Sequence, residues 1–151
     1  MTSTVPETTS RPENAAAHVL EVTHLDGDAY AIDVRGHQLL VDQPTDAGGK
    51  DTAPTPTELF AASLATCVAF YAGRYLQRHG LHHTGLRVRA EFTMAIDRPA
   101  RVASVRVILT PPSALSAQRH AALLAVASHC TIHNTLRQPP EIDIELEPQL
   151  R

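Results

Sequence analysis

The sequence predicts an α+β domain in which antiparallel strands pack against helices. Short segments alternate apolar and polar residues, as half-buried strands do, and two longer segments combine apolar helical spacing with capping signals. Turn residues separate successive strands, which favours hairpins over parallel crossovers. The expected order is therefore β-β-β-α-β-β-α-β, with an antiparallel sheet packed on a long buried central helix. The 151 residues suit one domain.

The N-terminal residues 1–16 are rich in Thr, Ser, Pro and Glu and lack apolar periodicity. This composition predicts a flexible tail or arm, with a single folded domain over residues 17–151. The tail has no basic segment followed by an apolar core, so it does not resemble a secretory signal. We therefore expect a cytoplasmic protein.

Three strands are expected in the first third of the domain, over residues 18–24, 30–34 and 38–42. Gly27 and Gly36 lie in the two turns between them, where a positive φ is often needed. The loop over residues 43–55 is long for so small a domain, and loops of this length are often functional.

The central helix has the clearest signals in the chain. Thr55, Pro56 and Glu58 match a capping box with proline at the first helical position, and Gly80 stands where a helix ends. Apolar residues cover nearly every face of the first half, so the helix must be surrounded by protein. A partner subunit is therefore expected. The apolar run over residues 59–72 is shorter than the roughly 20 residues that a membrane-spanning helix needs.

A hairpin and a second helix follow. Alternation over residues 86–96 and again over residues 105–109 predicts two antiparallel strands, with a turn at residues 97–100. Ser113 or Ser116 is expected to cap the second helix. Ile142, Ile144 and Leu146 alternate with acidic residues and predict a last strand.

Composition excludes several classes of partner. The net charge of −3 and a pI near 6.3 give no basic surface for nucleic acid or for an anionic membrane, and aromatic residues are too few for base stacking. Nine histidines prompt the question of a metal, and His129, Cys130 and His133 are close in sequence. No established ligand spacing is present, so we expect no metal site.

The two cysteines allow two interpretations. Cys67 and Cys130 can both be small buried hydrophobes, which is common for free cysteine. Alternatively, one thiolate attacks a peroxide and becomes a sulfenic acid, and the other condenses with it to a disulfide. The second interpretation needs the thiols to meet in space and a cation to lower one pKa. Arg35, Arg74 and His129 are candidate cations.

Residues 54–67, with the sequence PTPTELFAASLATC, resemble the segment that opens the central helix in the OsmC/Ohr family of thiol peroxidases. Residues 130–136, CTIHNTL, are similar to the family's second cysteine motif, and residues 41–44, VDQP, to its strand end before a glycine-bearing loop. The resemblance covers about residues 18–147, and the two cysteine motifs occur in the family's order.

This resemblance implies an intertwined homodimer with active sites at the subunit interface. It also implies reduction of organic hydroperoxides, with hydrogen peroxide as a further substrate. Cys67 would attack the peroxide and Cys130 would resolve the sulfenic acid. The family's reductant is a dithiol, often a lipoyl group, so no bound cofactor is expected.

The chain departs from the family pattern at two positions, Thr57 and Thr131. The family's helix acid stands ten residues before the first cysteine, but here that position is Thr57, and Glu58 stands nine residues before Cys67. Glu58 is therefore a candidate both for catalysis and for the capping box. Arg35 is the one arginine between residues 18 and 56 and is the candidate activating cation. Thr131 replaces the usual proline after the second cysteine.

Two rival functions remain open. The apolar interface could bind a small hydrophobic molecule without catalysis, which the displaced helix acid would favour. The chain could also form a structural dimer with an inactive peroxidase site and inert buried thiols.

Overall fold

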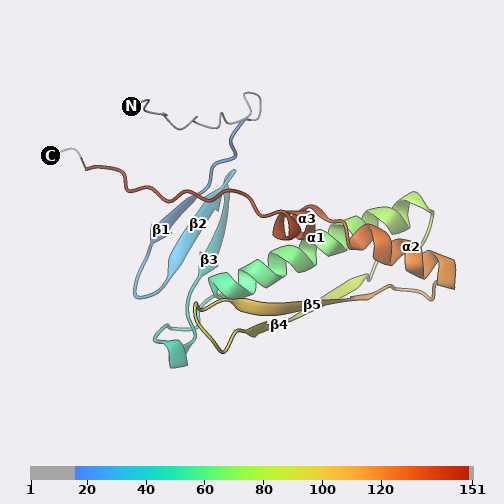
Figure 1. Cartoon of the computed structure of the whole chain (residues 1–151), viewed down its shortest axis with the longest axis horizontal. Helices are drawn as coiled ribbons and strands as arrows, with labels where there is room; N and C mark the ends of the chain where they lie inside the picture. The colour runs from blue at the N-terminus through green and yellow to red at the C-terminus, as the bar shows by residue number, and fades with distance from the viewer. Residues whose placement is uncertain (1–15, 150–151) are drawn as a thin grey trace, which may run out of the picture. The chain divides into compact units, whose positions relative to one another are not determined.

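The computed structural model describes residues 16–149, so the predicted tail lies almost wholly outside the described residues. The chain forms two compact units that divide between Pro54 and Thr55. The first is a three-stranded sheet, and the second contains three α-helices and a two-stranded sheet (Figure 1). The α+β class with antiparallel sheets is therefore confirmed, whereas the single domain over residues 17–151 stays a prediction.

The first unit is an antiparallel sheet in the order β1-β2-β3. Strand β1 spans Glu21–His24, β2 spans Tyr30–Val34 and β3 spans His37–Val41. β1 begins three residues later than predicted, because its pairing with β2 begins only where Glu21 meets Asp33. A short 3-10 helix, η1, spans Thr45–Ala47 in the loop that follows β3.

The turn between β2 and β3 has only two residues, Arg35 and Gly36. Their φ angles are 52° and 80°, and Val34 pairs with His37 across the turn. Two positive φ values match the two-residue turn whose twist suits a hairpin. Gly36 takes this conformation without steric cost, whereas Arg35 takes it with a side chain attached.

The second unit is organised around α1, which spans Pro56–Arg78. The predicted capping box is present: the Thr55 hydroxyl accepts the Glu58 N–H at 3.1 Å, and the Glu58 carboxylate accepts the Thr55 N–H at 2.8 Å. At the other end Gly80 has a φ of 64°, and the N–H of Leu81 donates to the Leu76 carbonyl. This is the glycine-ended helix terminus that the sequence predicts.

Strands β4 (Arg87–Met94) and β5 (Val102–Thr110) form an antiparallel hairpin that lies along α1 (Figure 1). Helix α2 spans Ala117–Ala127 and is capped by Ser116, whose hydroxyl accepts the Arg119 N–H at 3.2 Å. Helix α3 spans Thr131–Arg137. Both helices contact α1. The buried core of this unit comprises Leu64, Val68, Ala72, Tyr75, Leu76, Leu123, Ala127 and Cys130.

Helix α1 is long and apolar enough to cross a membrane by length and composition, but 33% of its apolar window is already buried within this chain. It is the core helix of the second unit. Phe60 and Phe70 remain 38% and 59% exposed. Residues 16–149 therefore leave part of its apolar surface uncovered, and its burial by a partner subunit stays a prediction.

The predicted C-terminal strand is wrong for this chain. Residues 138–149 contain no strand, and Ile142, Ile144 and Leu146 are 76%, 94% and 96% exposed. Alternation describes which side chains a strand would bury, but a strand also needs a neighbouring edge for its backbone hydrogen bonds. No strand of the described residues pairs with this segment.

Candidate thiol site

Cys67 lies in the middle of α1, on the part of the helix that packs into the core of the second unit. Its neighbours Leu64 and Val68 are buried, and Cys67 itself is half-buried. A partly exposed thiol on a rigid helix is accessible to a small reactant while its position stays fixed.

Cys130 lies at the N-terminus of α3 and is completely buried. Its extended backbone, with φ −68° and ψ 156°, is usual for an N-cap residue, and its sulfur takes the acceptor role of a capping side chain. The His133 N–H donates to Cys130 Sγ at 3.4 Å. The cap and the short helix behind it hold the sulfur in one orientation.

The structure brings the two thiols together. Cys67 packs against the buried cluster that contains Cys130, and α1 contacts α3. Burial raises the pKa of the Cys130 thiol, the His133 N–H lowers it, and the neighbouring Cys67 sulfur raises it further. Both cysteines are free thiols. A pair of adjacent free thiols, one half-exposed and one buried, can form a disulfide when the first is oxidised.

One interhelical hydrogen bond lies beside this pair. Tyr71 is four residues after Cys67 on α1, and its hydroxyl is 2.8 Å from Thr131 Oγ1 at the start of α3. Sequence reasoning missed Tyr71 and gave no partner to Thr131, because the two positions differ by 60 and no local motif links them.

Glu58 is engaged at the start of α1 by the capping box described above. One carboxylate oxygen accepts the Thr55 N–H at 2.8 Å, so the structure supports its interpretation as a helix-capping acid. A catalytic role for Glu58 stays a prediction.

No cation beside Cys67 is identified among the contacts within residues 55–149. No hydrogen bond or ion pair in this part of the second unit links a cationic side chain to the Cys67 sulfur. The Arg74 guanidinium lies over the Phe70 ring, 5.6 Å from its centre, and His129 Nδ1 is 2.7 Å from the Ala125 carbonyl. Arg35 belongs to the first unit, so its role stays a prediction.

A groove of about 400 Å³ lies along the second half of α1, beyond Cys67, and is closed on one side by Val126 of α2. Its lining has three aromatic residues, two arginines, one histidine and one valine. The lining residues are Phe70, Tyr71, Arg74, Tyr75, Arg78, His79 and Val126. Such a groove can hold an apolar molecule of modest size. In residues 16–149 no three His, Cys, Asp or Glu side chains lie close enough to hold a metal ion.

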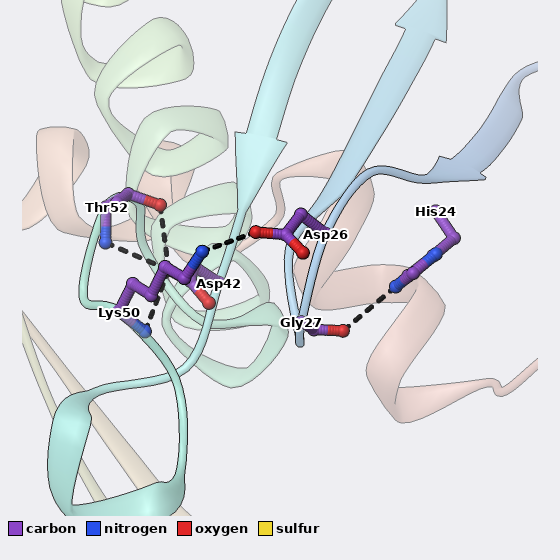
Figure 2. Close-up of polar contacts among 6 residues, drawn as sticks. All are labelled: His24, Asp26, Gly27, Asp42, Lys50 and Thr52. Carbon is purple, nitrogen blue, oxygen red and sulfur yellow. Dashed lines mark hydrogen bonds and ion pairs between the residues drawn. The ribbon is translucent and has the colours of Figure 1, made fainter.

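In the first unit, a buried carboxylate organises the long loop after β3 (Figure 2). Asp42 is 1% exposed and accepts hydrogen bonds from the N–H groups of Gln43, Lys50 and Thr52 and from the Thr52 hydroxyl. These donors, with Thr52 first, lower the pKa of Asp42 to about 2. Lys50 also pairs with Asp26 of the β1–β2 turn, so the loop is held at two points.

Comparisons with known proteins agree with this architecture. No curated protein matches the chain in sequence. A Psychrobacter arcticus protein, described as an osmotic stress induced and detoxification response protein, is 23% identical with a TM-score of 0.75, over 82% of this chain and 91% of that one. At these identities the solved structures show a shared fold alone.

Two further structures are of proteins described as organic hydroperoxide resistance proteins. OhrB of Bacillus subtilis is 18% identical with a TM-score of 0.58, over 80% of this chain and 92% of its own. A Vibrio cholerae protein, with captopril bound in one of its active sites, is 19% identical with a TM-score of 0.64, over 85% of this chain and 90% of its own. The family model described as OsmC-like protein matches residues 48–145. This match spans most of the chain and includes both cysteines, so the protein belongs to the OsmC-like family.

Proposed function

We propose that this protein is a thiol peroxidase that reduces organic hydroperoxides, with hydrogen peroxide as a further substrate. The observation that carries the proposal is the meeting of two free thiols, Cys67 and Cys130, which lie 63 positions apart in the chain. Characterised members of the family are organic hydroperoxide reductases, and hydroperoxide resistance proteins share this fold.

In the first step, the Cys67 thiolate attacks the terminal oxygen of the hydroperoxide. An S–O bond forms and the O–O bond breaks, so the sulfur loses two electrons and the departing alkoxide takes a proton to become an alcohol. In the second step, Cys130 loses its proton and its sulfur attacks the sulfur of Cys67. An S–S bond forms, the S–O bond breaks, and the departing hydroxide takes up the proton that Cys130 lost and leaves as water.

Activation and turnover need groups beyond the two sulfurs. Arg35 is our candidate for the cation that keeps Cys67 ionised, and Glu58 is the candidate acid that would hold that arginine, in addition to its role at the helix cap. The family uses no bound cofactor. An external dithiol of the lipoyl type would reopen the disulfide, and the cytoplasm would keep that dithiol reduced.

The working assembly in this proposal is a homodimer. The uncovered Phe60 and Phe70 on the core helix and the unpaired residues 142–146 present apolar surface that a second copy could bury. Native mass spectrometry should then give twice the mass of the chain, and a monomer at micromolar concentration would contradict this part of the proposal.

The proposal is tested by following peroxide consumption in an assay coupled to a dithiol. Cys67→Ser should abolish consumption of an organic hydroperoxide, because serine cannot form a sulfenic acid. Ser63→Ala, an exposed position one turn earlier on α1, is the matched control and should keep full activity. Retained turnover in Cys67→Ser would remove Cys67 as the nucleophile.

A binding protein without peroxidase activity is the second candidate. The groove along α1, with its three aromatic lining residues, and the absence of a cation contact to Cys67 within residues 55–149 favour it. Native mass spectrometry of the purified protein separates the two functions. A co-purified apolar ligand together with no peroxide consumption would support binding, and turnover would support the peroxidase.

A further inference from the structure

The hydrogen bond between Tyr71 and Thr131 is the feature of the thiol site that neither cysteine explains. It joins α1 to α3 with 2.8 Å between the two hydroxyl oxygens. Tyr71 is half-buried, whereas Thr131 is exposed, so folding does not require these hydroxyls to pair with each other. Water could serve either group equally well.

Each residue of the Tyr71–Thr131 hydrogen bond lies close in sequence to one of the two cysteines. Tyr71 follows Cys67 by four residues, so both side chains lie on one face of α1, about 6 Å apart along the helix axis. Thr131 follows Cys130 directly and is the first residue of α3. The bond therefore ties the segment that carries Cys130 to the helix that carries Cys67, four residues after Cys67 and one residue after Cys130.

Little else in α3 fixes its position. The helix has seven residues, none of them buried, and an isolated helix of this length is not stable in water. Its anchors beside α1 are the buried Cys130 side chain, the partly buried Ile132 and His133, and the Tyr71–Thr131 bond. Of these, only the bond is directional and independent of the sulfur that reacts.

We propose that Tyr71 is a positioning residue for disulfide formation, acting through Thr131 to hold Cys130 against Cys67. The inference rests on the proposed function for its place in the catalytic cycle. The step it controls is the attack of Cys130 on the Cys67 sulfenic acid, in which the S–S bond forms and hydroxide leaves. It has no part in the earlier attack of Cys67 on the peroxide.

This role has a distinct kinetic consequence. The sulfenic acid of Cys67 partitions between attack by Cys130, which gives the disulfide, and reaction with a second peroxide, which gives the sulfinic acid and one more alcohol. The first route is intramolecular and depends on position, and the second depends only on peroxide concentration. Loosening α3 slows the first route and leaves the second unchanged.

The test compares Tyr71→Phe and Thr131→Val, which each remove one hydroxyl and keep the shape of the side chain, with Thr131→Ser, which keeps a hydroxyl. We expect the ratio of sulfinic acid to disulfide, measured by intact mass after a peroxide pulse, to rise about threefold to tenfold in the first two variants, as the loss of one hydrogen bond allows. Thr131→Ser should remain near the wild-type ratio. The double variant Tyr71→Phe, Thr131→Val should be no worse than either single variant, because both remove the same bond.

A second arm avoids peroxide altogether. Oxidised glutathione attacked by Cys67 gives a mixed disulfide and one glutathione thiolate, and Cys130 then displaces the second glutathione. The mixed disulfide should accumulate about threefold to tenfold more in Tyr71→Phe than in wild type, by the same loss of one bond. If wild type is not oxidised by peroxide, the proposed function fails, and this arm still decides the positioning role.

The inference is overturned if the partition ratio and the mixed disulfide are both unchanged in Tyr71→Phe and Thr131→Val. It is also overturned if Thr131→Ser behaves like Thr131→Val, because the hydroxyl would then be irrelevant. A global loss of structure is excluded by the rate of Cys67 sulfenic acid formation, which should be the same in all variants.

Discussion

The sulfur of Cys130 accepts the backbone N–H of His133 at 3.4 Å and thereby caps α3 with a thiol. The same sulfur is fully buried and neighbours Cys67. One atom thus has a structural role and a proposed chemical role, and substitutions can separate the two.

Cys130→Ser should keep the fold, because serine is among the best N-cap residues and its hydroxyl can accept the same N–H. Cys130→Ala loses the cap and should cost about 0.5–2 kcal/mol in the free energy of unfolding. Both variants should accumulate Cys67 sulfinic acid during turnover, visible by intact mass as a gain of two oxygen atoms. If the mass does not increase under excess peroxide, Cys130 does not have the resolving role.

Stability should fall with alkaline pH through Cys130. Burial, and then the neighbouring Cys67, raise the pKa of this thiol above its ordinary value of 9.0, against the lowering effect of the His133 N–H. The folded chain then keeps the proton at a pH where the unfolded chain has lost it, so the free energy of unfolding decreases as pH rises through 9.0 and above. Chemical denaturation between neutral and alkaline pH should show this decrease in wild type and a smaller one in Cys130→Ser. Equal slopes in the two proteins would refute the assignment.

Arg35→Asn should abolish most activity without unfolding the β2–β3 hairpin. Asn tolerates the left-handed conformation at φ 52° better than Arg and is favoured in such two-residue turns. The variant should therefore be at least as thermally stable as wild type, while Cys67 should be alkylated more slowly at neutral pH. An unchanged alkylation profile would show that another cation activates Cys67.

The hydrogen bonds from the loop after β3 to Asp42 should persist until the pH falls to about 2. The donors around Asp42 lower its pKa to about 2, so the stabilisation it provides is fully present above about 3.9, its ordinary value, and is lost as pH falls through about 2. Asp42→Asn should release the loop at neutral pH, because its NH₂ group would face donors. Faster hydrogen exchange at the Lys50 and Thr52 amides measures this, and Thr52→Val, which removes one of the donors, should give an intermediate effect. Wild-type exchange rates in Asp42→Asn would contradict the anchoring role.

Two glycine substitutions should have opposite effects on stability. A Cβ at Gly49 would lie 1.9 Å from the Gln43 carbonyl oxygen, so Gly49→Ala should destabilise by about 1–3 kcal/mol. A Cβ at Gly73, inside α1, would meet only Leu86 Cδ2 at 3.9 Å, so Gly73→Ala should stabilise by about 0.5–1 kcal/mol. Thermal unfolding of the pair is the measurement, and a shift of the same sign in both would be inconsistent with this geometry.

The elements that could be predicted from the sequence are those whose signals are local. The capping box at Thr55 and Glu58, the glycine end of α1 at Gly80 and the cap at Ser116 each depend on residues within one turn. The strand expected over residues 142–146 failed for the converse reason, because alternation says nothing about whether an edge is present to pair with.

For the candidate site, too, the sequence predicted the features with local signals and not those that depend on packing. The motifs pointed to Cys67 and Cys130, but their approach follows from how α3 packs on α1, which no spacing reveals. The Tyr71–Thr131 bond depends on the same packing and has no sequence signal. The contacts of Arg74 with the Phe70 ring and of His129 with the Ala125 carbonyl likewise depend on side-chain geometry that the sequence does not show.

The two sulfurs differ in exposure, so the two ends of a disulfide between Cys67 and Cys130 would differ in their access to a reductant. Because Cys130 is sealed from solvent and Cys67 is not, an incoming reductant can reach only one end of the bond. The mixed disulfide formed during reduction of this bond would then be carried by α1, and the buried sulfur would always be the one expelled.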